Sequence, residues 1–450
     1  MQTQTNSNNI SGDLPGNMGF PLLGETLAFL KNPFLFLEIR QKRHGNVFKS
    51  NVFGRKVAVL AGTEGAEAFY DQENISRKKA HPFPLVALFG GDNMEMFDGP
   101  KHLALKSTAL TAFDINAIAG YLPDMQLIIE TRLEQLAQMP DFSAVAEFRK
   151  LAIESICCSV MGLFPSPDTD EIARNYGLIL EGVISLPLNL PGTTFGKALA
   201  ARNRLFTRIR QVIRERRKHP TLDGLSRMLT AKTADGHTYT DEEALLEVHH
   251  IVMAGFIVYA LMAEAMRQLA QQPVLYKRCV EEIRQHAPDG PLTIGALSKL
   301  RTLTNVILEA KRFVPIVPLT FGRARRDFAC GGFVVPKDWT VYLALYLNNN
   351  DATIYSDPGK FDPDRFSTER NEHQKHPMAF IPQGAEPPTG HRCLGLDYST
   401  ILSVTFLALL VRNYEWELPS QDLEYKWNTV PPVPRGGLRF KLKKTTAGNE

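Results

Sequence analysis

The chain has 450 residues, of which 44% are hydrophobic and 22% are charged, and its formal net charge is +3. This composition is ordinary for a globular protein, and so small a charge excludes a strong electrostatic attraction to nucleic acid or to an anionic membrane. No Gly/Ser run, charge block or fixed-period repeat marks a linker. We therefore expect one domain over residues 1–450, although the length would also suit more than one.

The N-terminal residues 1–20 are polar and loop-like, and they resemble neither a signal peptide nor a membrane anchor. We expect them to form a flexible segment. The longest apolar run, residues 251–263, is too short to span a bilayer and fits a buried helix. Five cysteines without metal-ligand spacing indicate reduced thiols. These features predict a cytoplasmic protein with no membrane span, which we expect to be a monomer.

The first half of the chain begins with strand-like sequence patterns and continues with helical ones. In chain order, the pattern predicts an extended segment over 15–24, a helix over 34–42, a hairpin around Phe53 and Gly54, an apolar loop over 80–97, and helices through 116–216 with breaks at 165–167 and 187–192. The apolar loop carries Phe83, Leu88 and Phe89. It either packs on the core or lines an apolar cavity, and the residues alone do not decide between the two.

The second half of the chain opens with a capping box at Thr240 and Glu243, which predicts the start of a long helix that runs to about residue 272. The later elements are a helix over 296–313, strand-like runs over 320–335 and 340–347, and a last long helix over 396–412. We therefore predict a mostly α fold with small β-sheets.

The most informative segment is the loop over residues 380–395, which ends in Cys393 directly before the last helix. A thiolate at this place is stabilised by the positive end of the helix and by nearby backbone N–H groups. Gly390 and Gly395 would let a flat cofactor approach the backbone. A lone cysteine before a helix is, however, more often structural.

Two further motifs carry charge. Glu309 and Arg312 share a helix face, and Arg365 lies in the Pro-marked turn 361–366. Each motif is weak alone, because surface ion pairs of this kind are common. The order and spacing of the three motifs resemble the cytochrome P450 superfamily, and the resemblance covers nearly the whole chain. The family's E-x-x-R, F-x-P-x-R-F and Cys-x-Gly patterns match these residues one by one.

This resemblance implies a heme b cofactor between the long central helix and the loop of Cys393, with Cys393 as the iron ligand and Gly395 beside the cofactor. Glu309, Arg312 and Arg365 would form a structural ion cluster. Donors to the heme propionates, by the same resemblance, are His102, Lys106, Arg323 and His391. Lys106 stands where the family has Arg, and His391 stands where it usually has Arg.

The loop of Cys393 departs from the family pattern, because Phe380 lies thirteen residues before the cysteine, farther than usual. The sequences of this loop and of the C-terminal region are similar to those of the bacterial fatty-acid peroxygenase branch. The Arg-Pro pair of that branch, however, is missing near Met253 and Ala254. The longer loop could hinder docking of an electron donor.

The central helix departs more sharply. Ala254 and Gly255 match the family, but Ile257 and Val258 replace the acid and the alcohol that relay protons. Tyr259 is a poor substitute, because a helix step turns it away from the direction of Val258. We expect Ala254, Gly255, Ile257 and Val258 to form the distal wall, and the substrate pocket to comprise Phe83, Leu88, Phe89, His250, Ile316, Val317 and Leu319.

The adjacent His249 and His250 have two interpretations: a proton donor or polar substrate contact, or ordinary core histidines, which we favour. The expected function is oxygen insertion into a lipophilic small molecule, by hydroxylation or epoxidation, with electrons from a separate ferredoxin or flavodoxin reductase system. Two alternatives stay open, a reaction driven by hydrogen peroxide and a redox-neutral rearrangement or dehydration. The Ile257-Val258 pair favours both alternatives.

Overall fold

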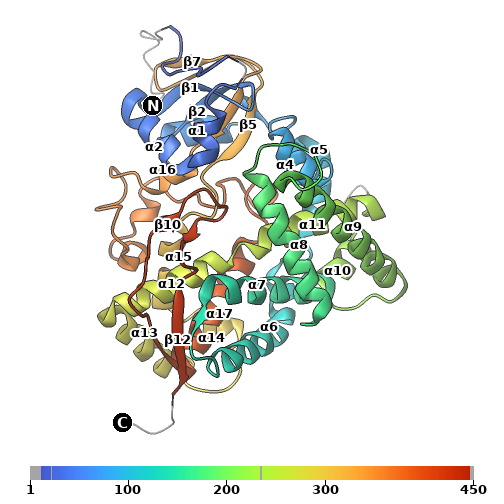
Figure 1. The fold of residues 1–450 in the computed structure, drawn as a ribbon, viewed down its shortest axis with the longest axis vertical. Coiled ribbons are helices and arrows are strands. Elements are labelled where there is room, and N and C mark those ends of the chain that lie inside the picture. The colour runs from blue at the N-terminus through green and yellow to red at the C-terminus, as the bar shows by residue number, and fades with distance from the viewer. Residues whose placement is uncertain (1–11, 22, 234–235, 446–450) are drawn as a thin grey trace, which may run out of the picture.

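The computed structural model describes residues 12–21, 23–233 and 236–445. One sheet lies with helices α1 and α2 at the N-terminal end of the molecule, and most helices form the rest, with strands such as β10 and β12 beside them (Figure 1). The helices are α1 (Thr26–Lys31), α2 (Pro33–His44), α3 (Gly62–Tyr70), α4 (Phe83–Phe89), α5 (Gly99–Leu110), α6 (Ile115–Leu136), α7 (Ala144–Met161), α8 (Pro167–Val183), α9 (Thr194–Lys218), α10 (Gly224–Thr230), α11 (Asp241–Phe256), α12 (Tyr259–Gln271), α13 (Pro273–His286), α14 (Ile294–Leu297), α15 (Arg301–Phe313), α16 (Leu345–Asn349) and α17 (Leu396–Asn413). The predicted mostly α fold is confirmed.

The largest sheet has five strands in the order β1-β2-β8-β5-β3. The strands of the structure are β1 (Val47–Val52), β2 (Arg55–Leu60), β3 (Ile75–Ser76), β4 (Phe142–Ser143), β5 (Thr320–Ala324), β6 (Phe328–Cys330), β7 (Phe333–Val335), β8 (Thr340–Leu343), β9 (Tyr414–Glu417), β10 (Tyr425–Lys426), β11 (Val433–Pro434) and β12 (Arg439–Lys444). Strands β2 and β8 pair in parallel, and the other pairs of this sheet are antiparallel. The sheet therefore joins the N-terminal hairpin to strands from the last third of the chain.

The predicted hairpin around Phe53 and Gly54 is confirmed as β1–β2, and both turn residues have positive φ angles. Of the N-terminal segment expected to be flexible, residues 1–11 lie outside the described part of the chain. Residues 12–20 run beside β1, where Lys49 donates its backbone N–H to Pro15 at 2.7 Å and the Leu14 side chain is buried.

Segment 80–97, expected to be a loop, contains a short helix instead. Helix α4 begins at Phe83, directly after Pro82, and ends at Phe89; the next residue, Gly90, is left-handed (φ 84°) and donates its backbone N–H to the Val86 and Ala87 carbonyls. Proline before the first turn and glycine after the last are ordinary helix boundary signals. The surrounding sequence is rich in Pro and Gly, so its pattern predicts a loop despite these signals.

The central helix is interrupted. Helix α11 begins with the predicted capping box of Thr240 and Glu243, which is confirmed, but the helix ends at Phe256. Ile257 and Val258 form a turn, after which α12 continues. The 31-residue stretch from Asp241 to Gln271 is long and apolar enough to cross a membrane, yet 72% of its most apolar window is buried inside the protein. We therefore interpret it as a core helix pair.

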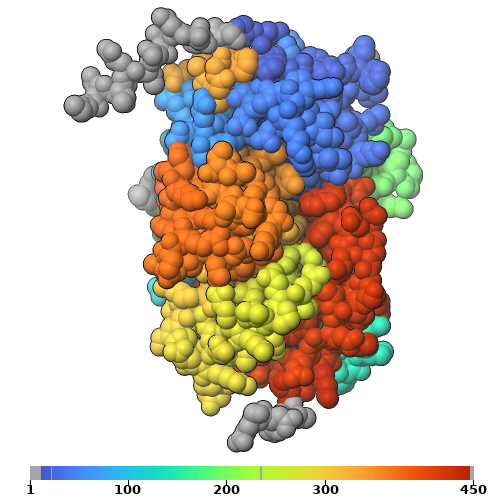
Figure 2. Space-filling view, turned by 90° about the vertical axis from the view of Figure 1, so that its left-hand side faces the viewer, coloured from blue at the N-terminus to red at the C-terminus, as the bar shows by residue number. Residues whose placement is uncertain are grey.

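Most of the hydrophobic core lies among α6, α7, α11, α12, α15 and α17, and a second cluster lies against the sheet. The segment that carries the Cys393 loop, orange in the side view, fills the space between the N-terminal sheet region and the helices below it (Figure 2). The site described next lies where these two parts meet.

Candidate functional site

A cavity of about 310 Å³ lies between the α11–α12 connection and the loop that ends in Cys393. The two walls come from parts of the chain more than 100 residues apart, and residues of the large sheet close one side. A larger hollow of about 1010 Å³ lies at the surface between α6 and the end of α17, and none of the predicted site residues line it.

Cys393 forms part of the cavity floor. Its backbone N–H donates to the Gln383 carbonyl oxygen at 2.8 Å, and the Gln383 side-chain amide donates to its Sγ at 3.4 Å. Helix α17 begins just beyond it, with Gly395 at the N-cap position. The sulfur therefore has a hydrogen-bond donor and a helix N-terminus beside it, as a charged thiolate requires.

The other four cysteines, Cys157, Cys158, Cys279 and Cys330, are buried. Burial raises the pKa of Cys158, Cys279 and Cys330 to about 12, which keeps these thiols protonated and unreactive. Cys393 alone among the five is partly exposed, and it faces the cavity.

The opposite wall is the interrupted helix. Ala254, Gly255, Ile257 and Val258, which the sequence placed on the distal wall, all line the cavity. At the interruption, backbone hydrogen bonds join residues three apart and not four apart as in an α-helix. The Ala260 N–H donates to the Ile257 carbonyl at 3.4 Å, and the Leu261 N–H donates to the Val258 carbonyl at 2.9 Å. The wall therefore changes direction at the two residues that stand in place of the acid and the alcohol.

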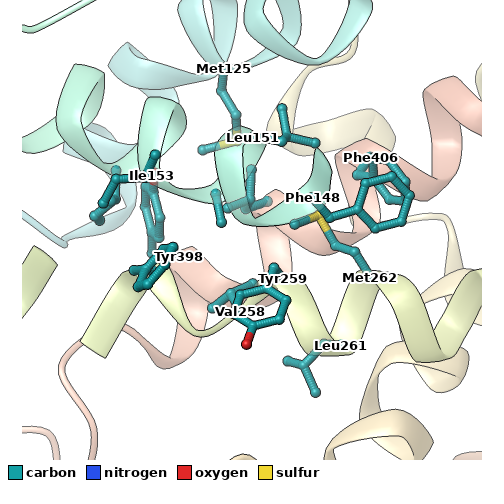
Figure 3. Packing of buried hydrophobic residues seen from close by; sticks show 14 of the residues in the cluster. Met125, Phe148, Leu151, Ile153, Val258, Tyr259, Leu261, Met262, Tyr398 and Phe406 are labelled. Carbon is teal, nitrogen blue, oxygen red and sulfur yellow. The ribbon is translucent and has the colours of Figure 1, made fainter. Parts of the chain in front are cut away.

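Gly255 and Tyr259 belong to the packing behind this wall. A Cβ at position 255 would lie 2.8 Å from a side-chain carbon of Ile156, so helix packing against α7 requires glycine there. The Tyr259 hydroxyl accepts a hydrogen bond from Arg149 at 3.1 Å, and Tyr259 is not among the cavity-lining residues. Figure 3 shows Val258 and Tyr259 at the turn, facing the apolar side chains of α7.

The two central histidines have different surroundings. His249 is buried, with its ring between the Tyr176 hydroxyl at 3.2 Å and the Leu88 carbonyl at 3.0 Å. Burial lowers the pKa of His249 to about 4, which keeps it neutral near pH 7. His250 lines the cavity instead, and its buried Nδ1 makes no hydrogen bond but lies 3.7 Å from the Glu247 carboxylate. The core interpretation therefore suits His249 but not His250.

A polar rim lies beside the floor. The rings of His102 and His391 stack with centroids 3.9 Å apart. His102 Nδ1 lies 2.8 Å from the Met94 carbonyl oxygen, whereas its buried Nε2 has no partner. His391 lines the cavity. A buried ring nitrogen without a partner is costly unless a bound group satisfies it.

Cations complete this rim. Lys106 is buried and donates to the Arg392 carbonyl at 2.6 Å, which ties α5 to the Cys393 loop. Arg77, which no sequence motif marked, lines the cavity and donates to Thr320 Oγ1 at 3.0 Å and to the Phe321 carbonyl at 2.6 Å. It follows the short strand β3, and a lone arginine after so short a strand gives no recognisable signal.

The sequence also missed one acidic cavity residue. Glu95 lines the cavity, with its carboxylate 3.8 Å from His391 Nδ1. Burial opposes its ionisation, but the interaction with His391 and the charge of Lys106 outweigh burial and hold the Glu95 pKa well below its usual value. The rim therefore carries one carboxylate among its cations.

The structure places Arg323 elsewhere. Its guanidinium donates to Asp338 at 3.0 Å, the side chain is 37% exposed, and it does not line the cavity. From β5 only Thr320 and Phe321 line the cavity, and Arg323 lies beyond them toward Asp338. Arg77, and not Arg323, is the arginine that lines the cavity.

Two residues of the predicted substrate pocket also lie elsewhere. Phe83 begins α4 and is 65% exposed, while Leu88 is buried in the core without lining the cavity. The helical turn of α4 presents Phe89, as predicted, and Leu85, which was not predicted, to the cavity. The other predicted pocket residues, His250, Ile316, Val317 and Leu319, also line it.

A buried ion cluster holds the floor in place. Both Glu309 oxygens accept from Arg312 at 2.7 Å, and Arg365 lies 3.3 Å from Glu309. Arg365 also donates to the carbonyls of Asp357 and Lys360. The side chains of Glu309, Arg312 and Arg365 are fully buried. The cluster therefore clamps α15 to the segment that leads into the Cys393 loop.

These residues fit a heme. The cavity offers one thiol with a donor at its sulfur, an apolar opposite wall, and a rim with the unpartnered Nε2 of His102 near Lys106 and His391. Cys393 would hold the iron, and the rim would bind the propionates. Nothing lies within 4 Å of a Cβ built on Gly395, so the backbone there is open to a flat group.

A protein-family model described as "Cytochrome P450" matches residues 14–436 of the chain. Among curated proteins, the chain is 29% identical over 448 residues to abscisic acid 8′-hydroxylase 4 of Arabidopsis thaliana, covering 96% of this chain and 92% of that protein. It is 28% identical over 439 residues to the putative cytochrome P450 120 of Synechocystis sp., covering 95% and 96% of the two chains.

Solved structures give the same picture of the fold. The retinoic acid-bound cyanobacterial CYP120A1 is similar with a TM-score of 0.89 and 26% identity, covering 96% of this chain and all of that one. A CYP152N1 structure with myristic acid has a TM-score of 0.80 at 24% identity, over 96% of this chain and 100% of that one. The second likeness concerns the fold alone.

Proposed function

This chain belongs to the cytochrome P450 family, and we propose that it inserts oxygen into a lipophilic small molecule, by hydroxylation or epoxidation, with electrons from separate redox partners. The family makes the chain an oxidoreductase with a heme iron cofactor. We propose that the cofactor is heme b, held by Cys393 at the iron and by the cationic rim at its propionates. We also propose that the protein works as a cytoplasmic monomer.

The observation that carries this proposal is the position of Cys393, whose sulfur faces the cavity opposite the central helix. When bound, a thiolate-ligated heme supplies the oxidising chemistry, and the protein supplies ligand, pocket and field. Cys393 would hold the iron while Gln383 donates to its sulfur. Ile257 and Val258 would keep water from the reacting face.

The substrate class follows from the distal side of the cavity. Leu85, Phe89, Ile316, Val317 and Leu319 present an apolar lining, which suits an aliphatic or aromatic body. His250 adds a polar ring to this lining, with its buried Nδ1 3.7 Å from the Glu247 carboxylate. We propose that the cavity side of this ring contacts a polar group of the substrate. Abscisic acid and retinoic acid, which appear in the names of relatives, share such a combination of apolar body and polar end.

A second candidate function is oxidation driven by hydrogen peroxide. The side chains of the central helix that line the cavity are those of His250, Ile251, Ala254, Ile257 and Val258, beside Gly255, and none of them is a carboxyl or hydroxyl group. Peroxide already contains the reduced oxygen pair, so it needs neither electron delivery nor the family's usual acid and alcohol. The same observation favours a redox-neutral rearrangement as a third candidate.

The test is a comparison of oxidants on one substrate panel that includes lipophilic acids. The purified protein is incubated with NADPH and a ferredoxin or flavodoxin reductase system, with hydrogen peroxide alone, or with neither. We expect an oxygenated product with the reductase system, and none from the C393A variant. Product in the incubation with peroxide, and none with the reductase system, would contradict the first proposal and favour the second. Product in the incubation with neither oxidant system would favour the third.

A further inference from the structure

The floor of the cavity holds a buried cation that the mechanism above does not use. Lys311 lies on α15 between Ala310 and Arg312, and it is only 3% exposed. It lies two positions after Glu309, which is about 200° around a helix. One face of α15 therefore carries the ion cluster, and the other presents the Lys311 ammonium to the Cys393 loop.

Three oxygens hold this ammonium. Its nitrogen lies 2.7 Å from Gln383 Oε1, 2.8 Å from Thr400 Oγ1 and 3.1 Å from Ser399 Oγ. An ammonium has three N–H donors and no acceptor, so these contacts use all of its hydrogen-bonding capacity. The partners come from the Cys393 loop and the first turns of α17, which makes Lys311 a fixed part of the floor.

All three partners are neutral. Among the described residues, no carboxylate forms an ion pair with Lys311, and a buried charge without a counter-charge is costly. Burial lowers the Lys311 pKa to about 8, which still leaves the side chain charged at pH 7. The negative groups that favour this charge are first Cys393 and then the exposed Asp397. The natural counter-charge of Lys311 is therefore the thiolate.

Gln383 connects the two groups. An amide oxygen and an amide nitrogen are hard to distinguish by shape, but the ammonium can only donate, so it must face the oxygen. The Gln383 nitrogen is then forced toward Cys393 Sγ, 3.4 Å away. Because hydrogen bonds in a chain polarise one another, the ammonium also strengthens the N–H that the sulfur receives.

We propose that Lys311 is a positioning residue that, through Gln383, withdraws electron density from the Cys393 sulfur and so raises the reduction potential of the bound heme. This inference rests on the proposed thiolate ligation. A fixed positive charge near the ligand favours the more negative, reduced state of the site. A floor without this cation would make the sulfur a stronger electron donor and the iron harder to reduce.

The test uses three variants of the heme-loaded protein. K311M keeps the length of the side chain and removes its charge, K311R keeps a charge, and Q383L removes the link. The midpoint potential is measured by spectroelectrochemical titration, and the carbon–oxygen stretch of the reduced carbon monoxide complex is measured by infrared spectroscopy. The matched control is K360M, which removes a charge from an exposed lysine, where solvent screens it.

We expect K311M and Q383L each to lower both the midpoint potential and the stretching frequency, while K311R and K360M stay close to the parent protein. We expect the K311M/Q383L double variant to have nearly the same midpoint potential as either single variant, because both substitutions interrupt the same chain of hydrogen bonds. If K311M folds poorly, Q383L alone must show the shift.

An unchanged or higher potential in both K311M and Q383L would overturn the inference, even if their unfolding temperatures fell, because a purely structural role moves stability and not potential. Failure of the underlying function looks different. In that case the parent protein itself lacks the spectrum of thiolate ligation, whatever residue stands at position 311.

Discussion

The floor and the distal wall of the cavity differ in how fully their polar groups are paired and in how regular their backbone is. On the floor, the charged groups are paired or hydrogen-bonded, from the Glu309 cluster to the Lys311 ammonium. On the distal wall, the helix is interrupted at Ile257 and Val258, and the buried Nδ1 of His250 makes no hydrogen bond, with the Glu247 carboxylate 3.7 Å away. This difference suggests that the floor fixes the chemistry common to the family, whereas the wall decides which molecule and which oxidant are used.

The largest effect should come from breaking the floor. In E309Q the carboxylate between Arg312 and Arg365 is lost, which leaves the buried Arg312 charge uncompensated, while Arg365 keeps its pair with Glu372. We expect the free energy of unfolding to fall by about 3–5 kcal/mol, measured by denaturant titration together with heme content.

The matched control is D364N, which breaks the half-exposed ion pair with Arg278. A pair in solvent is worth about 1 kcal/mol or less. If E309Q lost no more stability than D364N, the contrast between a rigid floor and the surface would be wrong.

A smaller effect should come from the rim. In H102F the ring stack with His391 is kept, but the unpartnered Nε2 is removed. A hydrogen bond to a charged propionate is worth about 1.5–3 kcal/mol, so heme should dissociate at least roughly tenfold faster. Transfer of heme to an excess of a heme-binding globin measures this rate.

R323M is the comparison variant, because the structure pairs Arg323 with Asp338 away from the cavity. We expect its heme dissociation rate to stay near that of the parent protein. A loss of heme from R323M as fast as from H102F would restore the assignment made from the sequence.

On the distal wall, H250F replaces the polar edge of the cavity with an apolar ring. We expect a substrate that carries a polar end to lose about 0.5–1.5 kcal/mol of binding, measured by titration of the heme spectral shift. A lipophilic ligand without a polar group should bind as before. Equal losses for both ligands would show that His250 shapes the pocket without recognising a polar group.

The smallest effect should come from V258T, which restores an alcohol to the wall. If protons reach the site less readily than in other family members, the product formed per NADPH should rise roughly two- to fivefold, which is about 1 kcal/mol or less in barrier. Consumption of NADPH and formation of product are measured together. A parent protein that is already fully coupled would show that the missing alcohol is no defect.

The sequence predicted the residues of the floor and of the distal wall better than those of the rim and of helix α4, for a physical reason. Glu309, Arg312, Arg365 and Cys393 lie at fixed spacings on elements with clear boundaries, so the pattern predicts their contacts as well as their presence. The clamp around Glu309 and the position of Cys393 in the cavity agree with those expectations.

Residues whose position depends on local rotation were harder to place. Phe83 and Leu88 were expected to line the cavity, but the unrecognised helix α4 turns Leu85 toward it instead. Arg323 pairs with Asp338 away from the cavity, and Arg77, from a distant part of the chain, lines it. No spacing rule reports such neighbours, since they meet only in the folded protein.

The interruption of the central helix is the clearest example. The sequence pattern predicts one continuous apolar helix through Ile257 and Val258, and neither residue is a helix breaker. The structure shows a turn there, packed on α7 by way of Gly255 and Ile156. Tertiary packing, and not intrinsic propensity, determines this break.

The account depends most directly on the bond between Cys393 and the heme iron. The decisive measurement is the carbon monoxide difference spectrum of the reduced, heme-loaded protein, recorded beside the C393A variant. We predict the spectrum of thiolate ligation for the parent protein and its loss in C393A. A spectrum of histidine ligation in the parent protein, or a protein that binds no heme, would contradict the account.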